Sequence, residues 1–128
     1  MKKYLVCFIT ILSFIALSCS NKPYTNVSIQ KALDIINKST NLILLDVRTL
    51  EEYMSGGLPN SINIDVMNTD FKTKINMLDK SKEYVVYCKS GNRATIASSI
   101  MATNGFSHIY NLINIDYNDF VDAVLSNK

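Results

Sequence analysis

The fold is decided by residues 83–105, which read "EYVVYCKSGNRATIASSIMATNG". Aromatic and β-branched residues lead up to Cys88, and this composition predicts a buried strand. A helix of small and aliphatic residues begins near Asn92 and ends at Asn104-Gly105, a typical C-cap. A strand, a tight turn and a helix in this order indicate one half of a βαβ unit.

The rest of the chain continues this alternation. A helix over 29–38 follows Ser28, which can cap it, and places Ile29, Ala32, Leu33 and Ile36 on one face. A helix through Phe71, Ile75 and Leu78 is expected to begin at Asn68 or Thr69. The remaining strands are expected at 42–47, 62–66 and 107–112, with a helical turn at 50–54 and a last helix capped by Asp116.

Strands that alternate with helices predict an α/β fold, with a mostly parallel sheet covered by helices on both faces. In such sheets, binding sites form at the carboxyl ends of the strands. Cys88 ends the most hydrophobic strand of the chain. Its position alone makes it a candidate site residue.

Residues 1–18 have the pattern of an export signal, with Lys2 and Lys3 before an apolar run that is short for a bilayer. The run ends in small residues before Cys19 and resembles the lipobox of bacterial lipoproteins, whose cysteine is lipidated. We expect a signal peptide over 1–18, cleaved before Cys19, then a tether over 19–26 and one domain over 27–128. The expected location is the bacterial cell envelope, on the periplasmic or surface side, lipid-anchored to a membrane; a soluble periplasmic or secreted protein is the alternative.

Export changes the cysteine and charge balance. With Cys7 removed and Cys19 lipidated, Cys88 is the one thiol left, so it is either buried and inert or kept for its chemistry. Without Lys2 and Lys3 the 13 basic residues become 11, equal to the 11 acidic ones, which argues against nucleic-acid binding. The spacing of His, Cys and Asp indicates no metal site, and we expect no cofactor.

The turn after Cys88 favours anion chemistry. A tight strand-to-helix turn points backbone N–H groups inward, and the helix N-terminus adds positive potential, so both stabilise a thiolate nucleophile. Gly91 permits a backbone conformation closed to other residues. Lys89 and Arg93 supply cations for an anionic substrate. We therefore predict Cys88 as catalytic, and as its substrate-binding loop Lys89, Ser90, Gly91, Asn92 and Arg93.

Three stretches together resemble the rhodanese (sulfurtransferase) family over roughly residues 27 to 126. They are "LLDVRTLEEYMSGGLPNSINI" at 44–64, "VVYCKSGNRATIAS" at 85–98 and "GFSHIYNL" at 105–112. The resemblance implies a five-stranded parallel sheet with helices on both sides. It also implies that Cys88 accepts a sulfane sulfur as a persulfide and passes it to a thiophilic acceptor.

The resemblance further implies that Asp46 and Arg48 support the loop from the neighbouring strand end; an ordinary structural ion pair is the alternative. Glu52 and Tyr53 are interpreted as structural. Where the family commonly has a glycine pair and later a tryptophan, this chain has residues 113–120, "INIDYNDF", so the pocket wall is expected to differ there.

The expected function is therefore single-domain sulfur transfer between a small sulfane donor and a thiol acceptor, with the membrane contacted through the N-terminal lipid. An envelope persulfide carrier or redox-sensing module with little turnover is the alternative. A phosphatase or arsenate reductase of the same fold ranks lower, because related phosphatases place arginine six residues after the cysteine and Arg93 stands five after Cys88. His108, the one histidine, is interpreted as a strand-start residue, and the oligomeric state is left open.

Overall fold

The computed structural model describes residues 23–128, and the expectations for the signal peptide and for Cys19 lie outside this range. Strands and helices alternate along the chain. In order they are β1 (Thr25–Val27), α1 (Ile29–Lys38), β2 (Leu42–Asp46), α2 (Leu50–Met54), β3 (Ile62–Asn63), α3 (Phe71–Ile75), β4 (Glu83–Tyr87), α4 (Asn92–Thr103), β5 (Ile109–Leu112) and α5 (Tyr117–Ser126).

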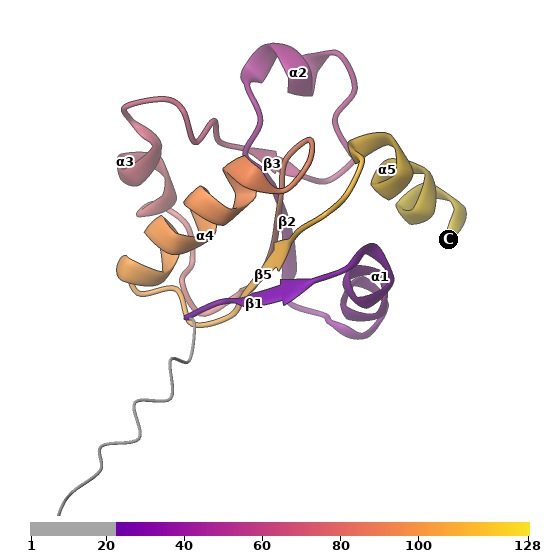
Figure 1. The fold of residues 1–128 in the computed structure, drawn as a ribbon. Coiled ribbons are helices and arrows are strands. Elements are labelled where there is room, and N and C mark those ends of the chain that lie inside the picture. Colours follow the sequence, from indigo (N-terminus) through magenta and orange to yellow (C-terminus); the bar gives the residue numbers. More distant parts are fainter. Residues whose placement is uncertain (1–22) are drawn as a thin grey trace, which may run out of the picture.

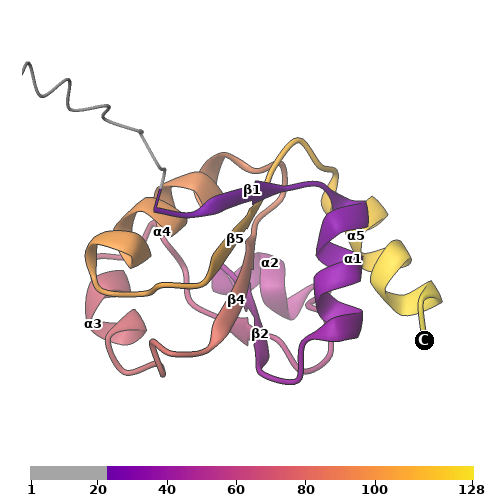
Figure 2. The same ribbon diagram turned by 90° about the horizontal axis from the view of Figure 1, so that it is seen from below.

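The five strands form one parallel sheet in the order β1-β5-β4-β2-β3. Helices α3 and α4 cover one face of this sheet, and α1 and α5 cover the other (Figures 1 and 2). The expected five-stranded α/β fold is confirmed. β4 lies in the middle of the sheet, between β5 and β2, so the residue that follows it emerges at the centre of the carboxyl edge.

Each face of the sheet has its own apolar core, because successive side chains of a strand point to opposite faces. In β4, Tyr84 and Val86 face α3 and α4, while Val85 and Tyr87 face α1 and α5. All four of these side chains are fully buried. This double burial explains why the strand reads as a continuous apolar run in the sequence.

Two predicted helix caps are confirmed, and two other elements differ from the prediction. Ser28 Oγ accepts from the N–H of Lys31 at 3.2 Å, and Asp116 caps α5. The strand expected over 62–66 is limited to Ile62–Asn63. The α3 helix begins after Asp70, which makes no side-chain capping bond, rather than after Asn68 or Thr69.

The N-terminal edge of the domain also differs from the prediction. Thr25 and Asn26, expected in the tether, belong to β1 and pair with Tyr110 and Asn111 of β5. Among residues 23–128, no helix is long and apolar enough to cross a membrane.

Candidate functional site

Cys88 follows β4 directly, and its side chain is held under the loop that leads into α4. The residue is only 1% exposed. Its Sγ accepts hydrogen bonds from the backbone N–H groups of Gly91 at 3.1 Å and Ala94 at 3.3 Å. Within the described part of the chain, these are the two donors to Sγ. The sulfur therefore sits in a backbone cradle at the N-terminus of α4, where partial positive charge favours an anion.

Gly91 is the turning point of this cradle. It caps α4 with φ at 113°, a left-handed conformation that glycine adopts without a steric penalty. A Cβ at this position would lie 3.0 Å from the Cα of Ile113, just beyond β5. The loop is thus packed backbone to backbone against the end of β5, and both the conformation and the space require glycine.

Arg93 does not point its guanidinium freely toward a substrate. Its two terminal nitrogens bind the two carboxylate oxygens of Glu52, Nη1 to Oε1 at 2.6 Å and Nη2 to Oε2 at 2.9 Å. This hydrogen bonding lowers the pKa of Glu52 to about 2 and raises that of Arg93. The bidentate pair joins the first turn of α4 to α2, so the predicted substrate contact of Arg93 stays a prediction.

Glu52 is itself fixed by the start of α2. Thr49 Oγ1 accepts from the N–H of Glu52 at 3.2 Å, and Glu52 Oε1 accepts from the N–H of Thr49 at 3.4 Å. These reciprocal bonds form a capping box. A local helix-start motif therefore holds the carboxylate that receives Arg93.

Arg48 and Asp46 form a second, more deeply buried pair at the end of β2. Arg48 Nε and Nη2 donate to the Asp46 carboxylate at 2.8 to 3.1 Å. Burial opposes the charge of the guanidinium, but the bonds to Asp46 outweigh this effect and raise the pKa of Arg48. The guanidinium carbon lies 3.5 Å from the ring centre of Tyr117, a cation–π contact.

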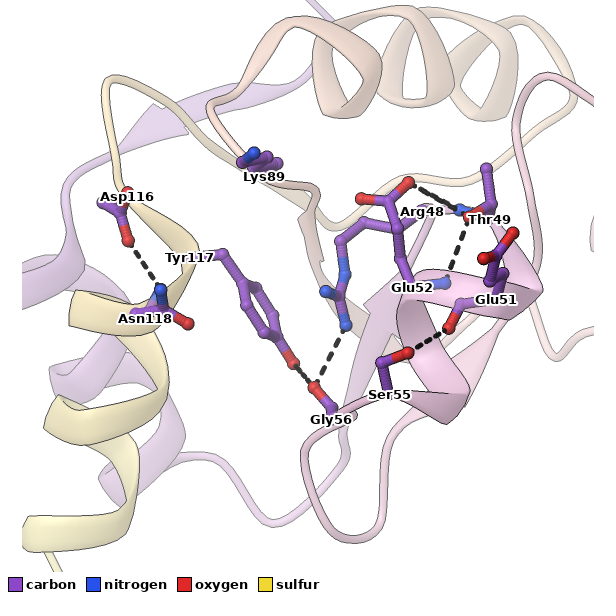
Figure 3. Close-up of a pocket in the computed structure, with 10 residues that line it drawn as sticks. All are labelled: Arg48, Thr49, Glu51, Glu52, Ser55, Gly56, Lys89, Asp116, Tyr117 and Asn118. Carbon is purple, nitrogen blue, oxygen red and sulfur yellow. Dashed lines mark hydrogen bonds between the residues drawn. The ribbon is translucent and has the colours of Figure 1, made fainter.

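Arg48 and Tyr117 border a cleft of about 580 Å³ between α2 and the start of α5 (Figure 3). Arg48 Nη2 and the hydroxyl of Tyr117 both donate to the carbonyl of Gly56, at 3.3 Å and 2.7 Å. Lys89, the neighbour of Cys88, lies on the rim. The cleft is lined by Arg48, Thr49, Glu51, Glu52, Ser55, Gly56, Lys89, Asp116, Tyr117 and Asn118.

The structure thus gathers most of the predicted site at one edge of the sheet. Lys89, Ser90 and Asn92 are exposed around the buried Cys88 and Gly91. His108 is exposed and precedes β5 at the opposite edge, since Tyr84 pairs with Ile109. Cys88 lies four residues further along the chain than Tyr84, which corresponds to about 13 Å of strand. Residues 23–128 contain no cluster of three or more potential metal ligands.

Two contacts were not predicted from the sequence. Glu52 has structural contacts, as expected, but its pairing with Arg93 was not predicted; the Glu-Tyr pair after Asp-Val-Arg is the signal that could have pointed to it. Tyr117 lies in the divergent segment 113–120, where we expected a changed pocket wall. An aromatic residue directly after a helix cap gives no sequence signal that it will contact a buried arginine.

Comparison with known proteins identifies the family of this domain. A sequence profile described as a Rhodanese-like domain matches residues 28–117. The chain is 33% identical over 99 residues to a protein named tRNA uridine(34) hydroxylase from Pelagibacter ubique, a match that covers 77% of this chain and 33% of that protein. It is 35% identical over 86 residues to a putative mitochondrial thiosulfate sulfurtransferase from Schizosaccharomyces pombe, covering 59% of each chain.

Among solved structures, a human single-domain sulfurtransferase superposes with a TM-score of 0.63 at 21% identity, covering 76% of this chain and 95% of that one. At this identity the likeness shows the fold alone. The chain spans only about a third of the hydroxylase it matches, so the reaction of that whole protein does not transfer to this domain.

Proposed function

Since the chain belongs to the Rhodanese-like domain family, we propose that it is a single-domain sulfurtransferase that carries sulfane sulfur as a persulfide on Cys88. The observation that supports this most directly is the pair of backbone bonds from Gly91 and Ala94 to Sγ. Donors fixed around a sulfur atom stabilise negative charge on it before and after the reaction.

The proposed reaction has two steps. The Cys88 thiolate attacks the terminal sulfur of a sulfane donor, forming a new S–S bond while the donor's own bond to that sulfur breaks. The donor remainder leaves with the electron pair, as sulfite does from thiosulfate. An acceptor thiolate then attacks the outer sulfur of the persulfide and restores the Cys88 thiolate.

The cradle has further backbone N–H donors for the outer sulfur of the persulfide. The N–H groups in the first turn of an α-helix have no acceptor within the helix. In α4 this leaves Asn92 and Arg93 beside the two groups that already bind Sγ. The ion pair between Arg93 and Glu52 ties this turn to α2.

The arrangement of Arg93 also favours sulfur transfer over phosphate chemistry. The terminal nitrogens of this guanidinium already bind both oxygens of a carboxylate, so a bidentate grip on a phosphoryl group would compete with Glu52. We expect no hydrolysis of p-nitrophenyl phosphate above the rate without protein. Hydrolysis that depends on Cys88 would reverse this ranking.

Mass spectrometry of the full chain tests the main proposal. Incubation with thiosulfate or polysulfide is expected to add one sulfur atom, and cyanide or a small thiol to remove it. The Cys88→Ser variant keeps Cys7 and Cys19 and is the matched control. A gain of one sulfur that persists in Cys88→Ser would contradict the proposal.

A persulfide carrier is the second candidate, and a comparison favours it. The chain is 26% identical over 87 residues to a putative sulfur carrier protein of Bacillus subtilis, covering 68% of this chain. Steady-state turnover with small donors and acceptors separates the two functions. A persulfide that forms on Cys88 but transfers to no small thiol would favour the carrier.

We also propose that the domain is exported and anchored by a lipid on Cys19. The support is the sequence pattern of residues 1–19. The mass of the chain isolated from a bacterial envelope fraction tests it. A lipid mass on a chain that begins at Cys19 is expected, and a chain that keeps its first eighteen residues would refute it.

A further inference from the structure

A buried chain of side-chain hydrogen bonds runs from the sheet to the cradle. Asn111 of β5 is fully buried, and its Nδ2 donates to Thr95 Oγ1 at 2.9 Å. Thr95 Oγ1 donates in turn to the carbonyl oxygen of Gly91, also at 2.9 Å. Gly91 is the residue whose N–H binds Cys88 Sγ. The side-chain amide of a strand residue is therefore linked in two steps to the carbonyl of Gly91, the residue whose N–H is a cradle donor.

A buried asparagine at position 111 is unfavourable for the stability of the fold. It lies on the face of the sheet where its strand neighbour Ile109 packs into the apolar core, and its Oδ1 has no hydrogen-bond partner among the described residues. A buried polar atom without a partner destabilises a fold. The compensation comes from the bonds of Nδ2, one to Thr95 and one to Asn26 Oδ1 at 3.0 Å.

Thr95 adds a restraint that the helix alone does not provide. The Gly91 carbonyl already accepts the helical bond from the Thr95 N–H at 3.0 Å, and the hydroxyl is a second donor to it. Because Asn111 donates to the hydroxyl oxygen, the hydroxyl proton is left for Gly91. The restraint acts on a glycine, the residue with the widest backbone freedom.

The other carbonyl beside this glycine is also held from β5. The N–H of Ile115, in the segment after β5, donates to the Ser90 carbonyl at 3.5 Å. The Ser90 carbonyl and the Gly91 N–H belong to one peptide group, so this contact and the Thr95 hydroxyl restrain Gly91 from both sides. The direction in which its N–H points at Sγ depends on both.

We propose that Thr95 and Asn111 are positioning residues, which hold the carbonyl of Gly91, restrict the backbone conformation of this glycine, and so fix the direction in which its N–H stabilises negative charge on Cys88. The inference rests on the proposed function only in taking Cys88 as the reactive group. Neither side chain is proposed to contact the sulfur.

The test compares Thr95→Val with Thr95→Ser in the full chain. The readout is the rate of Cys88 alkylation by iodoacetamide, because the thiolate is the form of the side chain that reacts. The peptide that contains Cys88 is quantified by mass spectrometry. Losing the aligned donor is expected to slow alkylation about threefold to tenfold in Thr95→Val. Thr95→Ser keeps the hydroxyl and is expected to restore the rate to within about twofold.

Two further variants separate positioning from stability. Thr103 makes a similar hydroxyl bond, to the Ile100 carbonyl at the far end of α4, so Thr103→Val controls for losing such a bond in the same helix. Its alkylation rate is expected to match that of the wild type. Asn111→Leu removes the bond to Thr95, so it is expected to slow alkylation. It also removes the unpaired buried oxygen, so it is not expected to lower the denaturation midpoint.

Several results would overturn the proposal. Thr95→Val could react at the wild-type rate, or Thr95→Ser could react as slowly as Thr95→Val. Faster alkylation of Thr95→Val, as expected if these bonds only shield the sulfur, would also overturn it. A wild-type chain that forms no persulfide would refute sulfur transfer but leave this comparison of alkylation rates valid.

Discussion

Replacing Glu52 with glutamine tests whether the ion pair between α2 and α4 stabilises the fold. The substitution removes the charge that pairs with Arg93, but a glutamine side chain can still serve the capping box at Thr49. The loss measured in Glu52→Gln is therefore mainly the ion pair. The protein is expected to stay folded with a lower free energy of unfolding.

The magnitude follows from the carboxyl group. The pKa of Glu52 is about 2 instead of 4.5, chiefly through the hydrogen bond from Arg93. At about 1.4 kcal/mol per pH unit, the full difference corresponds to about 3–4 kcal/mol. The two side chains are 23% and 32% exposed, so solvent screening reduces this value. We expect a loss of about 1–2 kcal/mol at neutral pH.

The pH dependence has a definite sign. A carboxylate with a lowered pKa stabilises the fold fully above its ordinary value, here 4.5, and loses that contribution as the pH falls toward about 2. The difference in unfolding free energy between wild type and Glu52→Gln should therefore be constant above pH 4.5 and shrink below it.

Urea denaturation at a series of pH values measures this difference. Glu51→Gln is the matched control, because Glu51 is an exposed acid in the same first turn of α2 and makes no ion pair in the described structure. Equal losses of unfolding free energy in Glu51→Gln and Glu52→Gln would refute a stabilising role of the ion pair between Glu52 and Arg93. A difference that stays constant down to pH 2 would refute its assignment to the Glu52 carboxylate.

Three other substitutions have expected outcomes. Arg48→Lys should destabilise the domain by about 2–4 kcal/mol in thermal or urea unfolding, because an ammonium cannot reproduce the bidentate bond to Asp46; an unchanged midpoint would contradict this. Gly91→Ala should cost about 1–3 kcal/mol and slow persulfide formation, since its Cβ would meet Ile113 at a strained φ, and wild-type kinetics would count against a fixed cradle. Asp116→Ala should lower the free energy of unfolding by about 1 kcal/mol through loss of the α5 cap. The same unfolding assay measures this, and an unchanged free energy of unfolding would mean that the cap does not stabilise the fold.

The fold was predictable where patterns are long or local. β4 and α4 carry clear strand and helix patterns, and the capping side chains of Ser28 and Asp116 lie within three residues of the N–H groups that donate to them. β1 was missed because it is three residues long and only Val27 is buried. A short, polar edge strand becomes a strand through its pairing with β5, which sequence periodicity does not record.

The candidate site was predictable in position but not in all of its contacts. A cysteine at the end of a buried strand, followed by glycine and a helix start, indicated the cradle. The partner of Arg93 is 41 residues away in sequence, and no local pattern specifies that pairing. The link from Asn111 to Thr95 likewise joins two elements that only the folded sheet brings together.

The parallel sheet gives the domain two different ends, one at the amino ends of the strands and one at their carboxyl ends. All five strands run the same way, so β1 enters at their amino ends, whereas Cys88 lies beyond their carboxyl ends. Across the five residues of β4 this separation is about 16 Å. A domain held by its N-terminus would turn the edge that carries Cys88 outward, away from whatever surface holds it. Large partners would then reach Cys88 without first approaching that surface.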